Sequence, residues 1–363
     1  MKITFVLPTV NLSGGIRVAA IYSRWLMRFG HQVVAVSPPP AVLFRHRLLR
    51  PLGLGTPRVA TESHFDNAGI DHRIIERSRA IEDNDVPDAD VVIATWWETA
   101  EWVAALSPAK GAKVYFVQHH EVFDWLPAER STATYRLPLR KIVVASWLQR
   151  VMNTDYGDIA VDLVPNAVDH EQFFAPKRGK RDRPTVGFLY SKAEFKGVDL
   201  TLRAIATLRL SFPALRVVSF GDQAPQGDEL GDVDFHLAPD QSKLRDLYAS
   251  CDVWMTASRS EGFNLPAMEA MACRTPVIAT CTGWPAEAIV DGANGWCVAL
   301  NDVHGLVRAA QFVLDLSDAD WRAMSTHAFD TVRGSSWEAS ARLFEASLIA
   351  TSAQSKTNAT SRS

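Results

Sequence analysis

With 363 residues, the chain is long enough for two domains that each bury a hydrophobic core. Hydrophobic residues make up 47% of it and the formal net charge is -3, which is typical of a soluble globular protein and argues against a nucleic-acid partner. The four cysteines form no C-x-x-C pair, and no segment has the about 18 consecutive apolar residues that cross a membrane. These features predict a cytoplasmic protein with reduced, buried thiols.

Short runs rich in β-branched and apolar residues predict strands along the whole chain. In the first half they are "KITFVL", "QVVAV", "DVVIAT", "KVYFVQ" and "KIVVAS", and in the second half "TVGFLY", "LRVVSFG", "VDFHLA", "DVWMTA" and "TPVIAT". Helical patterns such as "GIRVAAIYSRWLMRFG" and "KLRDLYASC" separate many of these runs. Because buried parallel strands read as continuous apolar runs between helices, the predicted fold class is α/β with parallel sheets.

The charged, proline-containing segment "HEQFFAPKRGKRDRP" interrupts this alternation at residues 170–184 and predicts a linker. It divides the chain into two Rossmann-like domains, 1–172 and 173–335. The end of the chain, "TSAQSKTNATSRS", lacks large apolar residues, so residues 351–363 are predicted to form a disordered tail.

The first 61 residues contain no Asp or Glu but eight basic residues. Within them "VLFRHRLLRPLGLG" (Val42–Gly55) mixes Leu and Phe with Arg45, Arg47 and Arg50. Two interpretations stay open: the segment lies on an anionic membrane surface, or it is a solvated loop whose arginines extend over apolar neighbours. The first would place the protein peripherally at the inner face of the membrane.

In open parallel sheets, ligands bind beyond the carboxyl ends of the strands, so the loops at that edge form the candidate site. The first such loop, "PTVNLSGGIRVAA", carries Gly14 and Gly15 into a predicted helix, where backbone N–H groups can approach a phosphate or a sugar. It lacks the G-x-G-x-x-G spacing of nicotinamide-binding folds, and a simple tight turn explains a Gly-Gly pair equally well.

The segment "SEGFNLPAMEAM" (Ser260–Met271) carries Glu261 and Glu269 after a predicted strand. Pro266 suits the first turn of a helix, so the free N–H groups around residues 263–265 would point at an anion. Glu269, one turn inside the helix, can accept two hydrogen bonds from a ribose diol, and Glu261 can meet a second polyol. Together these features fit a nucleotide-diphospho-sugar, although stabilisation of the helix terminus by charge would also account for Glu269.

Several ordered motifs resemble those of the retaining glycosyltransferases of family 4, which have the GT-B fold. They are the Glu-x7-Glu segment followed by "GWPAEAIVDGANGWCV", then "VPNAVD", "FKGVDLTLRAI", "FGD", the Gly14-Gly15 loop and "SSWEASARLFEASL". The resemblance covers nearly the whole chain and is strongest over residues 164–300. It implies two Rossmann-like domains facing each other across a cleft, with the acceptor on the N-terminal domain, the donor on the C-terminal domain, and a helix at 336–350 that crosses back to the first domain.

The resemblance further implies transfer of a sugar, with retained anomeric configuration, from a nucleotide-diphospho-sugar donor to a glycan or lipid-linked acceptor, as in bacterial cell-surface polysaccharide synthesis. It implies no cofactor, because positive side chains replace a metal at the diphosphate. A sugar-nucleotide epimerase of the same fold and a non-catalytic sugar-nucleotide-binding protein remain alternatives. "TWWETAEW" and "YFVQHHE" are additionally similar to a rhamnosyltransferase-like branch of the family.

In the family pattern Glu269 corresponds to the ribose ligand. Glu261 corresponds to a residue near the donor sugar and Lys196 to a ligand of the diphosphate. Both are predicted to bind the donor and to take part in catalysis. The other donor-side residues that the motifs imply are Gly14, Gly15, Gly221, Gly262, Phe263, Asn264 and Leu265.

The chain departs from the family pattern at three positions. Phe188 stands where Arg is usual, and Lys192 is the nearest replacement for that diphosphate ligand. Arg274 and Trp284 stand where Gly is usual. Because a lysine is a point charge without the bidentate fork of arginine, these departures affect how the donor is held.

The loop "QHHEVFDW" follows the strand "KVYFV" at the same edge. In the family a catalytic His in this loop approaches the donor sugar; His120, which precedes Glu121, is favoured, and His119 remains an alternative. Because adjacent strand residues face opposite sides, only one of them is expected in the site. Trp96 and Trp97 can stack on an acceptor sugar beside Glu121 or form a core pair, and both interpretations stay open.

Two segments, Asp88-Ala-Asp90 and Asp232-Val-Asp234, have the D-x-D spacing of some metal sites. Both precede or enter predicted strands, so ordinary surface loops explain them better. The sequence also lacks the Cys and His spacing of zinc sites, and no metal site is predicted.

Overall fold

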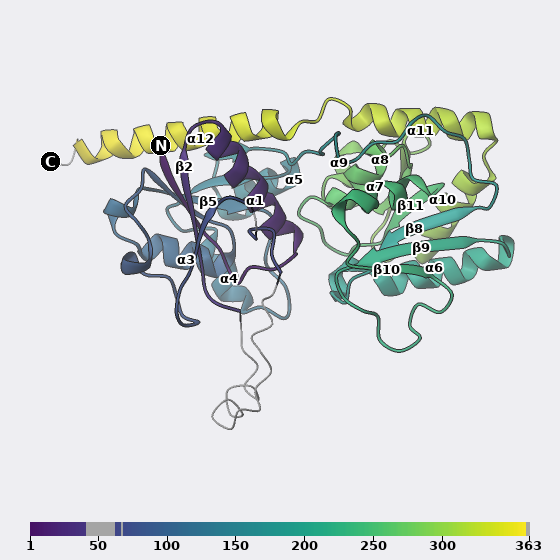
Figure 1. Ribbon diagram of the computed structural model, residues 1–363, viewed down its shortest axis with the longest axis horizontal. Coiled ribbons are helices and arrows are strands. Elements are labelled where there is room, and N and C mark those ends of the chain that lie inside the picture. The colour runs from purple at the N-terminus through teal and green to yellow at the C-terminus, as the bar shows by residue number, and fades with distance from the viewer. Residues whose placement is uncertain (41–61, 67, 361–363) are drawn as a thin grey trace, which may run out of the picture. The chain divides into compact units, whose positions relative to one another are not determined.

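The structure is a computed structural model, and it describes residues 1–40, 62–66 and 68–360. The chain divides into two compact units. Met1–Pro165 with Glu338–Ser363 forms unit 1, and Asn166–Trp337 forms unit 2. Figure 1 shows each unit as a sheet with helices packed around it. The boundary between the units lies before the predicted linker, which belongs to unit 2.

Unit 1 is built on seven strands in the order β3-β2-β1-β4-β5-β6-β7. The strands are β1 (Lys2–Val6), β2 (Gln32–Ser37), β3 (Asp71–Ile74), β4 (Val91–Ala94), β5 (Ala112–Val117), β6 (Arg140–Val143) and β7 (Val161–Leu163). All neighbouring pairs are parallel. The central strands β1, β4 and β5 are almost entirely buried, which explains their continuously apolar sequences.

Among the described residues, four helices and two short 3-10 turns connect these strands. They are α1 (Gly14–Arg28), α3 (Trp97–Ala105), α4 (Ala128–Thr134), α5 (Ser146–Tyr156), η2 (Asp83–Asp85) and η3 (Pro108–Lys110). In α1, Ala19, Ser23 and Leu26 are fully buried. Their spacing of four and three residues places them on one helix face, so α1 packs as an amphipathic helix.

Unit 2 is built on six strands in the order β10-β9-β8-β11-β12-β13, again all parallel. The strands are β8 (Thr185–Leu189), β9 (Arg216–Gly221), β10 (Asp234–Leu237), β11 (Val253–Thr256), β12 (Val277–Thr280) and β13 (Gly295–Val298). The connecting helices and turn are η4 (Glu194–Lys196), α6 (Val198–Ser211), α7 (Gln241–Ala249), α8 (Leu265–Ala272), α9 (Pro285–Ala288), α10 (Val303–Asp315) and α11 (Asp318–Val332).

The first strand of each unit lies inside its sheet, and the strand order reverses beside it. The reversal falls between β1 and β4 in unit 1 and between β8 and β11 in unit 2. At such a switch point the loops after the two strands diverge and leave room for a ligand. The predicted α/β class is confirmed, and the topology selects the carboxyl edge of each sheet as the place for a site.

The last helix, α12 (Trp337–Thr360), brings the chain from unit 2 back to unit 1. Its Phe344 is fully buried among Phe5, Tyr22 and Phe116, with ring centroids 6.3, 4.5 and 5.0 Å away. The helix continues through residues 351–360, where a disordered tail was predicted, so that prediction is corrected. Packing of the preceding turns on unit 1 supports this extension, since the Thr, Ser and Asn residues of the segment are weak helix formers by themselves.

The basic side chains of the predicted linker donate hydrogen bonds to backbone carbonyls at or just after the ends of helices. Lys180 Nζ donates to the carbonyls of Leu314 and Leu316 at the end of α10, at 2.5 and 2.7 Å. Arg183 Nε donates to the Ala214 carbonyl after α6 at 2.5 Å, and Arg181 donates to the last residue of α7. Carbonyls at helix ends have no partner within the helix, so cations stabilise them. The segment is therefore a structural brace of unit 2.

The basic segment Val42–Gly55, with Arg45, Arg47 and Arg50, lies outside the described residues, so its contact with a membrane stays a prediction. Among the helices that the structure does describe, none combines the length and the apolar character needed to cross a bilayer.

Candidate functional site

At the carboxyl edge of the unit 2 sheet, two predicted residues that are distant in sequence meet. Lys196, in the turn after β8, places Nζ 2.8 and 2.9 Å from the two carboxylate oxygens of Glu261, in the loop after β11. Ser258 Oγ donates to the same carboxylate at 2.7 Å. The Glu261 side chain is 7% exposed and the Lys196 side chain 24%, so the pair lies at the boundary between core and solvent.

The Lys196 turn has a shape that only glycine permits at its end. Gly197 has φ +63°, and a Cβ atom there would lie 2.0 Å from the Ala257 carbonyl oxygen. The turn that follows β8 therefore packs directly on the backbone that follows β11. The K-G motif of the sequence thus brings the lysine to Glu261.

Arg259 clamps this turn from the other side. Its guanidinium donates to both oxygens of Asp199 at 2.9 and 2.7 Å, to the Glu194 carbonyl at 2.8 Å and to Asn301 Oδ1 at 3.0 Å. Its backbone N–H donates to the Phe195 carbonyl at 2.7 Å. The sequence did not single out Arg259, and with its donors engaged in this way it holds the turn and is not positioned as a diphosphate ligand.

Helix α8 begins directly after the Glu261 loop. Asn264 caps it in a left-handed conformation, φ 79°, with Oδ1 accepting from Ala267 N–H and Nδ2 donating to Thr256 Oγ1 at 3.0 Å. Within the described part of the chain, the N–H groups of residues 263–265 donate to no protein acceptor. Such N–H groups at a helix end can bind an anion, and the anion-binding role of Phe263, Asn264 and Leu265 stays a prediction.

A small cavity lies between these elements, lined by Leu189, Lys196, Ser258, Glu261, Asn264 and Pro266 among others. It joins the carboxyl ends of β8 and β11, the switch point of unit 2. Gly262, between Glu261 and the helix cap, is buried at the same place. This grouping fits the chemistry predicted for Glu261 and Lys196.

Glu269 lies inside α8 and is 3% exposed. Its Oε2 accepts a hydrogen bond of 2.8 Å from the phenol of Tyr248, a fully buried residue of α7. The carboxylate is thus held in one orientation, a feature that the sequence did not reveal because Tyr248 is distant along the chain. Its role as a ribose ligand stays a prediction.

The departures from the family pattern have structural explanations. Phe188 is 1% exposed and belongs to the core of unit 2, whereas its neighbour Leu189 lines the cavity. Lys192 is exposed in the loop after β8. Arg274 adopts φ 60° at the end of α8, where glycine is favoured, and its guanidinium packs 4.2 Å from the ring centroid of Phe329.

The third departure, Trp284, lies beside the helix end. The Trp284 ring stacks on Phe263 with centroids 5.9 Å apart, and the backbone N–H of Trp284 donates to the Phe263 carbonyl at 2.8 Å. The preceding Gly283 has φ +66°, and a Cβ there would come within 2.8 Å of Glu261. This loop therefore braces the residues around Glu261.

The predicted glycines differ in how strictly they are required. At Gly221 a Cβ would lie 2.5 Å from the Tyr190 carbonyl oxygen, so this glycine allows close packing of two strand ends. A Cβ added at Gly14 would meet no atom of the described residues within 4 Å, and one added at Gly15 would make only ordinary contact with Gln118. Gln118 Nε2 donates to the Gly15 carbonyl at 3.1 Å and so links the Gly14-Gly15 loop to the end of β5.

The histidine loop after β5 belongs to unit 1. His120 Nε2 lies 2.7 Å from the Tyr156 hydroxyl, and burial lowers the pKa of His120, which favours the neutral ring at pH 7. His119 Nδ1 lies 3.0 Å from the His120 carbonyl oxygen, and its ring packs on Phe123. Both rings are half-buried, so burial does not distinguish the two candidates.

Trp97 and Glu121 are buried, at 3% and 2% exposure. Glu121 Oε2 accepts from the Trp97 N–H at 2.7 Å, at the start of α3, and from the Tyr115 phenol at 3.1 Å. This is a helix-capping arrangement in the core, so direct contact of these two side chains with an acceptor is corrected to a structural role. Trp96 is half-buried and keeps an accessible surface.

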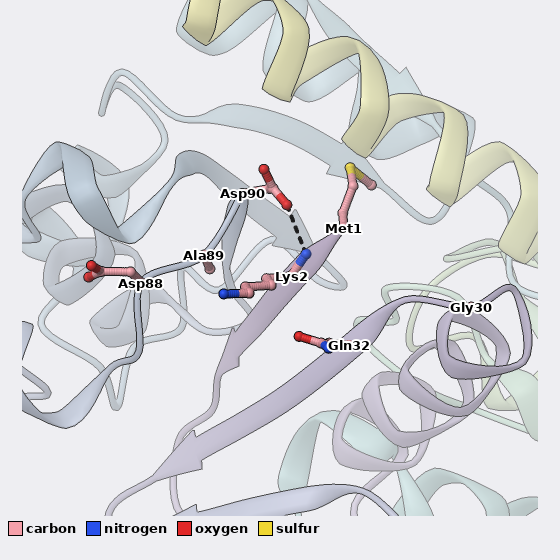
Figure 2. Close-up of a pocket in the computed structure, with 7 residues that line it drawn as sticks. All are labelled: Met1, Lys2, Gly30, Gln32, Asp88, Ala89 and Asp90. Atoms are coloured by element: carbon pink, nitrogen blue, oxygen red, sulfur yellow. Dashed lines mark hydrogen bonds between the residues drawn. The ribbon is translucent and has the colours of Figure 1, made fainter.

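Both D-x-D segments use their carboxylates in ion pairs. Asp88 pairs with Lys110 at 2.8 Å, and Asp90 accepts from the Lys2 N–H at 2.9 Å, the bond drawn in Figure 2, and from Lys356 at 3.1 Å. The hollow that Figure 2 shows lies where β1 and β2 begin, at the amino edge of the unit 1 sheet and so opposite the edge that carries the histidine loop.

The second D-x-D segment is engaged in the same way, since Asp232 pairs with Arg209 and Asp234 with Arg216. Across the described residues, three or more His, Cys, Asp or Glu side chains nowhere gather in a way that could hold a metal ion.

Comparison with known proteins gives consistent likenesses. Residues 183–315 match the family described as Glycosyl transferases group 1. The chain is 31% identical over 224 residues to the D-inositol 3-phosphate glycosyltransferase of Mycolicibacterium smegmatis, covering 56% of this chain and 50% of that protein. It is 27% identical over 196 residues to the glycogen synthase of Mycobacterium tuberculosis, 47% of each. The chain thus spans about half the length of these curated relatives.

Two solved structures share the fold over nearly the whole chain. Sucrose-phosphate synthase from Thermosynechococcus elongatus has a TM-score of 0.72 at 17% identity, covering 94% of this chain and 97% of that one. Anabaena HepE, solved with UDP and glucose, has a TM-score of 0.70 at 14% identity, covering 99% and 100%. These likenesses confirm the predicted fold of two parallel-sheet units.

Proposed function

We propose that the chain is a glycosyltransferase of the family 4 type, with the GT-B fold of its structural neighbours, and that it moves a sugar from a nucleotide-diphospho-sugar to a glycan or lipid-linked acceptor. In this proposal unit 2 binds the donor, unit 1 binds the acceptor, and the anomeric configuration is retained. The proposed setting is synthesis of a bacterial cell-surface polysaccharide in the cytoplasm, with the basic segment at residues 42–55 contacting the inner face of the membrane.

The observation that carries the proposal is the Lys196–Glu261 pair at the amino end of α8. When the bond between the anomeric carbon and the diphosphate breaks, negative charge develops on the leaving oxygen. A lysine and unpaired N–H groups directed at that oxygen stabilise the transition state more than the ground state. Glu261 holds Lys196 Nζ by two hydrogen bonds, so the cation is oriented before the donor arrives.

The rest of the donor is assigned to neighbouring groups in unit 2. The ribose diol is proposed to meet Glu269, whose carboxylate Tyr248 already orients, and the diphosphate to meet Lys192 as a second, exposed cation. Glu261 is assigned to the donor sugar. Because these groups supply charge directly, the proposal includes no metal or other cofactor.

On unit 1, the accessible Trp96 and one of the two loop histidines are proposed to face the reacting sugars. His120 is the favoured residue because its neutral ring can accept a proton or a hydrogen bond at pH 7. Trp96 offers an accessible aromatic surface at the start of α3.

A second candidate is a non-catalytic sugar-nucleotide-binding protein. The burial of Phe188 favours it, since the position that is usually Arg cannot supply a cation to the diphosphate. Donor binding without turnover would identify this function, whereas release of a free epimerised nucleotide sugar would identify an epimerase.

The test of the proposed function begins with donor binding. Calorimetry with UDP, GDP and dTDP should find one that binds, and Glu269→Gln should weaken it by about 2 kcal/mol, or about 30-fold, because a charge-assisted pair is lost. Glu287→Gln, an exposed glutamate of α9, is the matched control and should bind normally.

Two results would contradict the assignments. Equal affinity of the wild type and Glu269→Gln would remove the ribose role of Glu269. If none of the nucleoside diphosphates binds the wild type, the donor site proposed on unit 2 is wrong. Transfer of radiolabelled sugar from the matching nucleotide sugar to a glycan fraction then tests the reaction itself.

A further inference from the structure

A ladder of aromatic rings runs outward from the histidine loop of unit 1. Trp125 stacks on Phe123 with ring centroids 5.1 Å apart and planes only 9° from parallel. Phe123 in turn lies 4.9 Å from the His119 ring, which packs edge-on against Trp147 at 6.3 Å. Trp125 is 64% exposed, so the ladder ends in an indole that faces solvent.

Hydrogen bonds hold the backbone of the loop that carries these rings. The His119 carbonyl accepts a hydrogen bond of 3.2 Å from the phenol of Tyr135, which is fully buried. The same phenol accepts from the Glu121 N–H at 2.6 Å, and the turn that carries Trp125 is closed by the Leu126 N–H bonding to the Phe123 carbonyl at 2.9 Å. The exposed indole is therefore oriented before any ligand arrives, which lowers the entropy cost of binding.

An exposed indole with one face on a parallel ring has a specific use. One face of the indole packs on Phe123 while most of the side chain lies in solvent, so its other face is available to stack on a flat ligand. The C–H groups on one face of a pyranose ring fit a flat aromatic face, while the hydroxyl groups of the sugar stay in water. Asp124, exposed beside the indole, can accept hydrogen bonds from those hydroxyls.

We propose that Trp125, supported by Phe123, forms a stacking subsite for a pyranose ring of an acceptor glycan. The inference rests on the proposed function for the word acceptor, because the ladder continues to the loop of His119 and His120, where the reacting sugars are expected. It adds a site that lies on unit 1 alone and recognises a neutral sugar ring distant from the reacting one.

The test uses the full chain and direct glycan binding. An array of defined neutral oligosaccharides, including glucans, mannans, galactans and rhamnans, is probed with the wild type, and the bound member is followed by saturation-transfer NMR and calorimetry. Trp125→Ala should lose affinity on the order of tenfold, the loss of one aromatic stacking contact. Trp125→Phe keeps an aromatic face and should stay within about threefold of the wild type.

Two matched measurements exclude indirect effects. Ile159→Ala removes another exposed apolar side chain of unit 1, 83% exposed, and should bind glycan normally. Nucleoside diphosphate binding to unit 2 should be unchanged in all three variants, so its absence from the wild type would mark failure of the proposed function separately from failure of the subsite.

The proposal is overturned if Trp125→Ala binds the glycan as tightly as the wild type, or if the wild type binds no member of the array. It is also overturned if the indole serves a lipid surface instead. In that case phosphatidylglycerol vesicles would bind the wild type, lose affinity with Trp125→Ala, and compete with no oligosaccharide.

Discussion

Two buried glutamates, one in each unit, follow strands at the carboxyl edge and are stabilised in opposite ways. Glu261 in unit 2 receives Lys196 on both oxygens and the Ser258 hydroxyl on one. Glu121 in unit 1 receives a backbone N–H and a phenol, and no lysine or arginine of the described chain pairs with it. One carboxylate is thus balanced by a cation and the other by neutral donors only.

The difference shows what each edge is suited to bind. Burial raises the pKa of Glu121 well above its ordinary value, so the neutral form is favoured, and the loop that carries Glu121 exposes the indole of Trp125. The unit 2 edge keeps a lysine and the end of a helix at the rim of a cavity. Charged chemistry is therefore expected at unit 2, and recognition of neutral sugar surfaces at unit 1.

The largest effect is expected on stability, when a second cation is placed in the core of unit 2. Phe188→Arg would bury an unpaired guanidinium in the core and should lower the free energy of unfolding by about 3–5 kcal/mol, measured by denaturant titration. Leu189→Arg is the matched control, because the next side chain lines the cavity and can reach solvent. If Phe188→Arg is as stable as Leu189→Arg, the buried orientation of residue 188 is wrong.

Next in size is the loss of the lysine that balances Glu261. Lys196→Ala should lower the turnover of sugar transfer by more than about 100-fold, or about 2.7 kcal/mol, because it removes a donor to the leaving diphosphate. Lys192→Ala, which removes an exposed cation in the same loop, should lower it measurably but less. Chelators should leave the wild-type rate unchanged.

A different outcome would change the assignment of the diphosphate ligands. If Lys192→Ala is silent and chelation abolishes transfer, then a metal and not the lysines holds the diphosphate, and the contrast between the two edges does not arise from Lys196.

Local features of this molecule were predictable from sequence, and pairings between distant segments were not. The strands, the helix after Asn264 and the Glu261–Glu269 spacing follow from periodicity and turn residues that lie within a few positions of each other. The contact of Arg259 with Asp199 spans 60 residues, and no pattern in the chain indicates it.

The fold also buries two residues that the sequence indicated as accessible. Trp97 and Glu121 were candidates for acceptor contact because both follow predicted strands at the carboxyl edge, but the fold places both in the core. The extension of α12 past residue 350 was missed for a related reason, since the helix is held by Phe344 inside unit 1 and not by the composition of its end.

A smaller effect is expected from the clamp behind Lys196. Arg259→Lys keeps the charge but cannot reach Asp199, Asn301 and the Glu194 carbonyl together, so turnover should fall on the order of tenfold with little change in the affinity for nucleoside diphosphate.

Asp199→Asn should reproduce part of this loss, and the two changes combined should cost less than their sum, because they disrupt one shared contact. Arg209→Lys, which alters a surface ion pair of unit 2, should leave turnover intact. Equal losses from Arg209→Lys and Arg259→Lys would show that the clamp has no particular role in positioning Lys196.

The smallest effect concerns Glu121 and depends on pH. The folded-state pKa of this carboxyl lies above its unfolded value, so the folded protein holds the proton over a range in which the unfolded chain has released it. Stability should therefore fall as pH rises from about 4.3, the unfolded pKa, toward the folded pKa, with a slope of up to about 1.4 kcal/mol per pH unit.

Glu121→Gln cannot release a proton and lacks this slope, yet its amide oxygen can still accept from Trp97 and Tyr115. The two proteins should be similarly stable at about pH 4, and Glu121→Gln should gain on the wild type by about 1 kcal/mol at about pH 5. Glu129→Gln, an exposed change in α4, gives the baseline. If the difference between Glu121→Gln and the wild type stays constant across this range, Glu121 is charged in the folded protein, and the two glutamates are not stabilised in opposite ways.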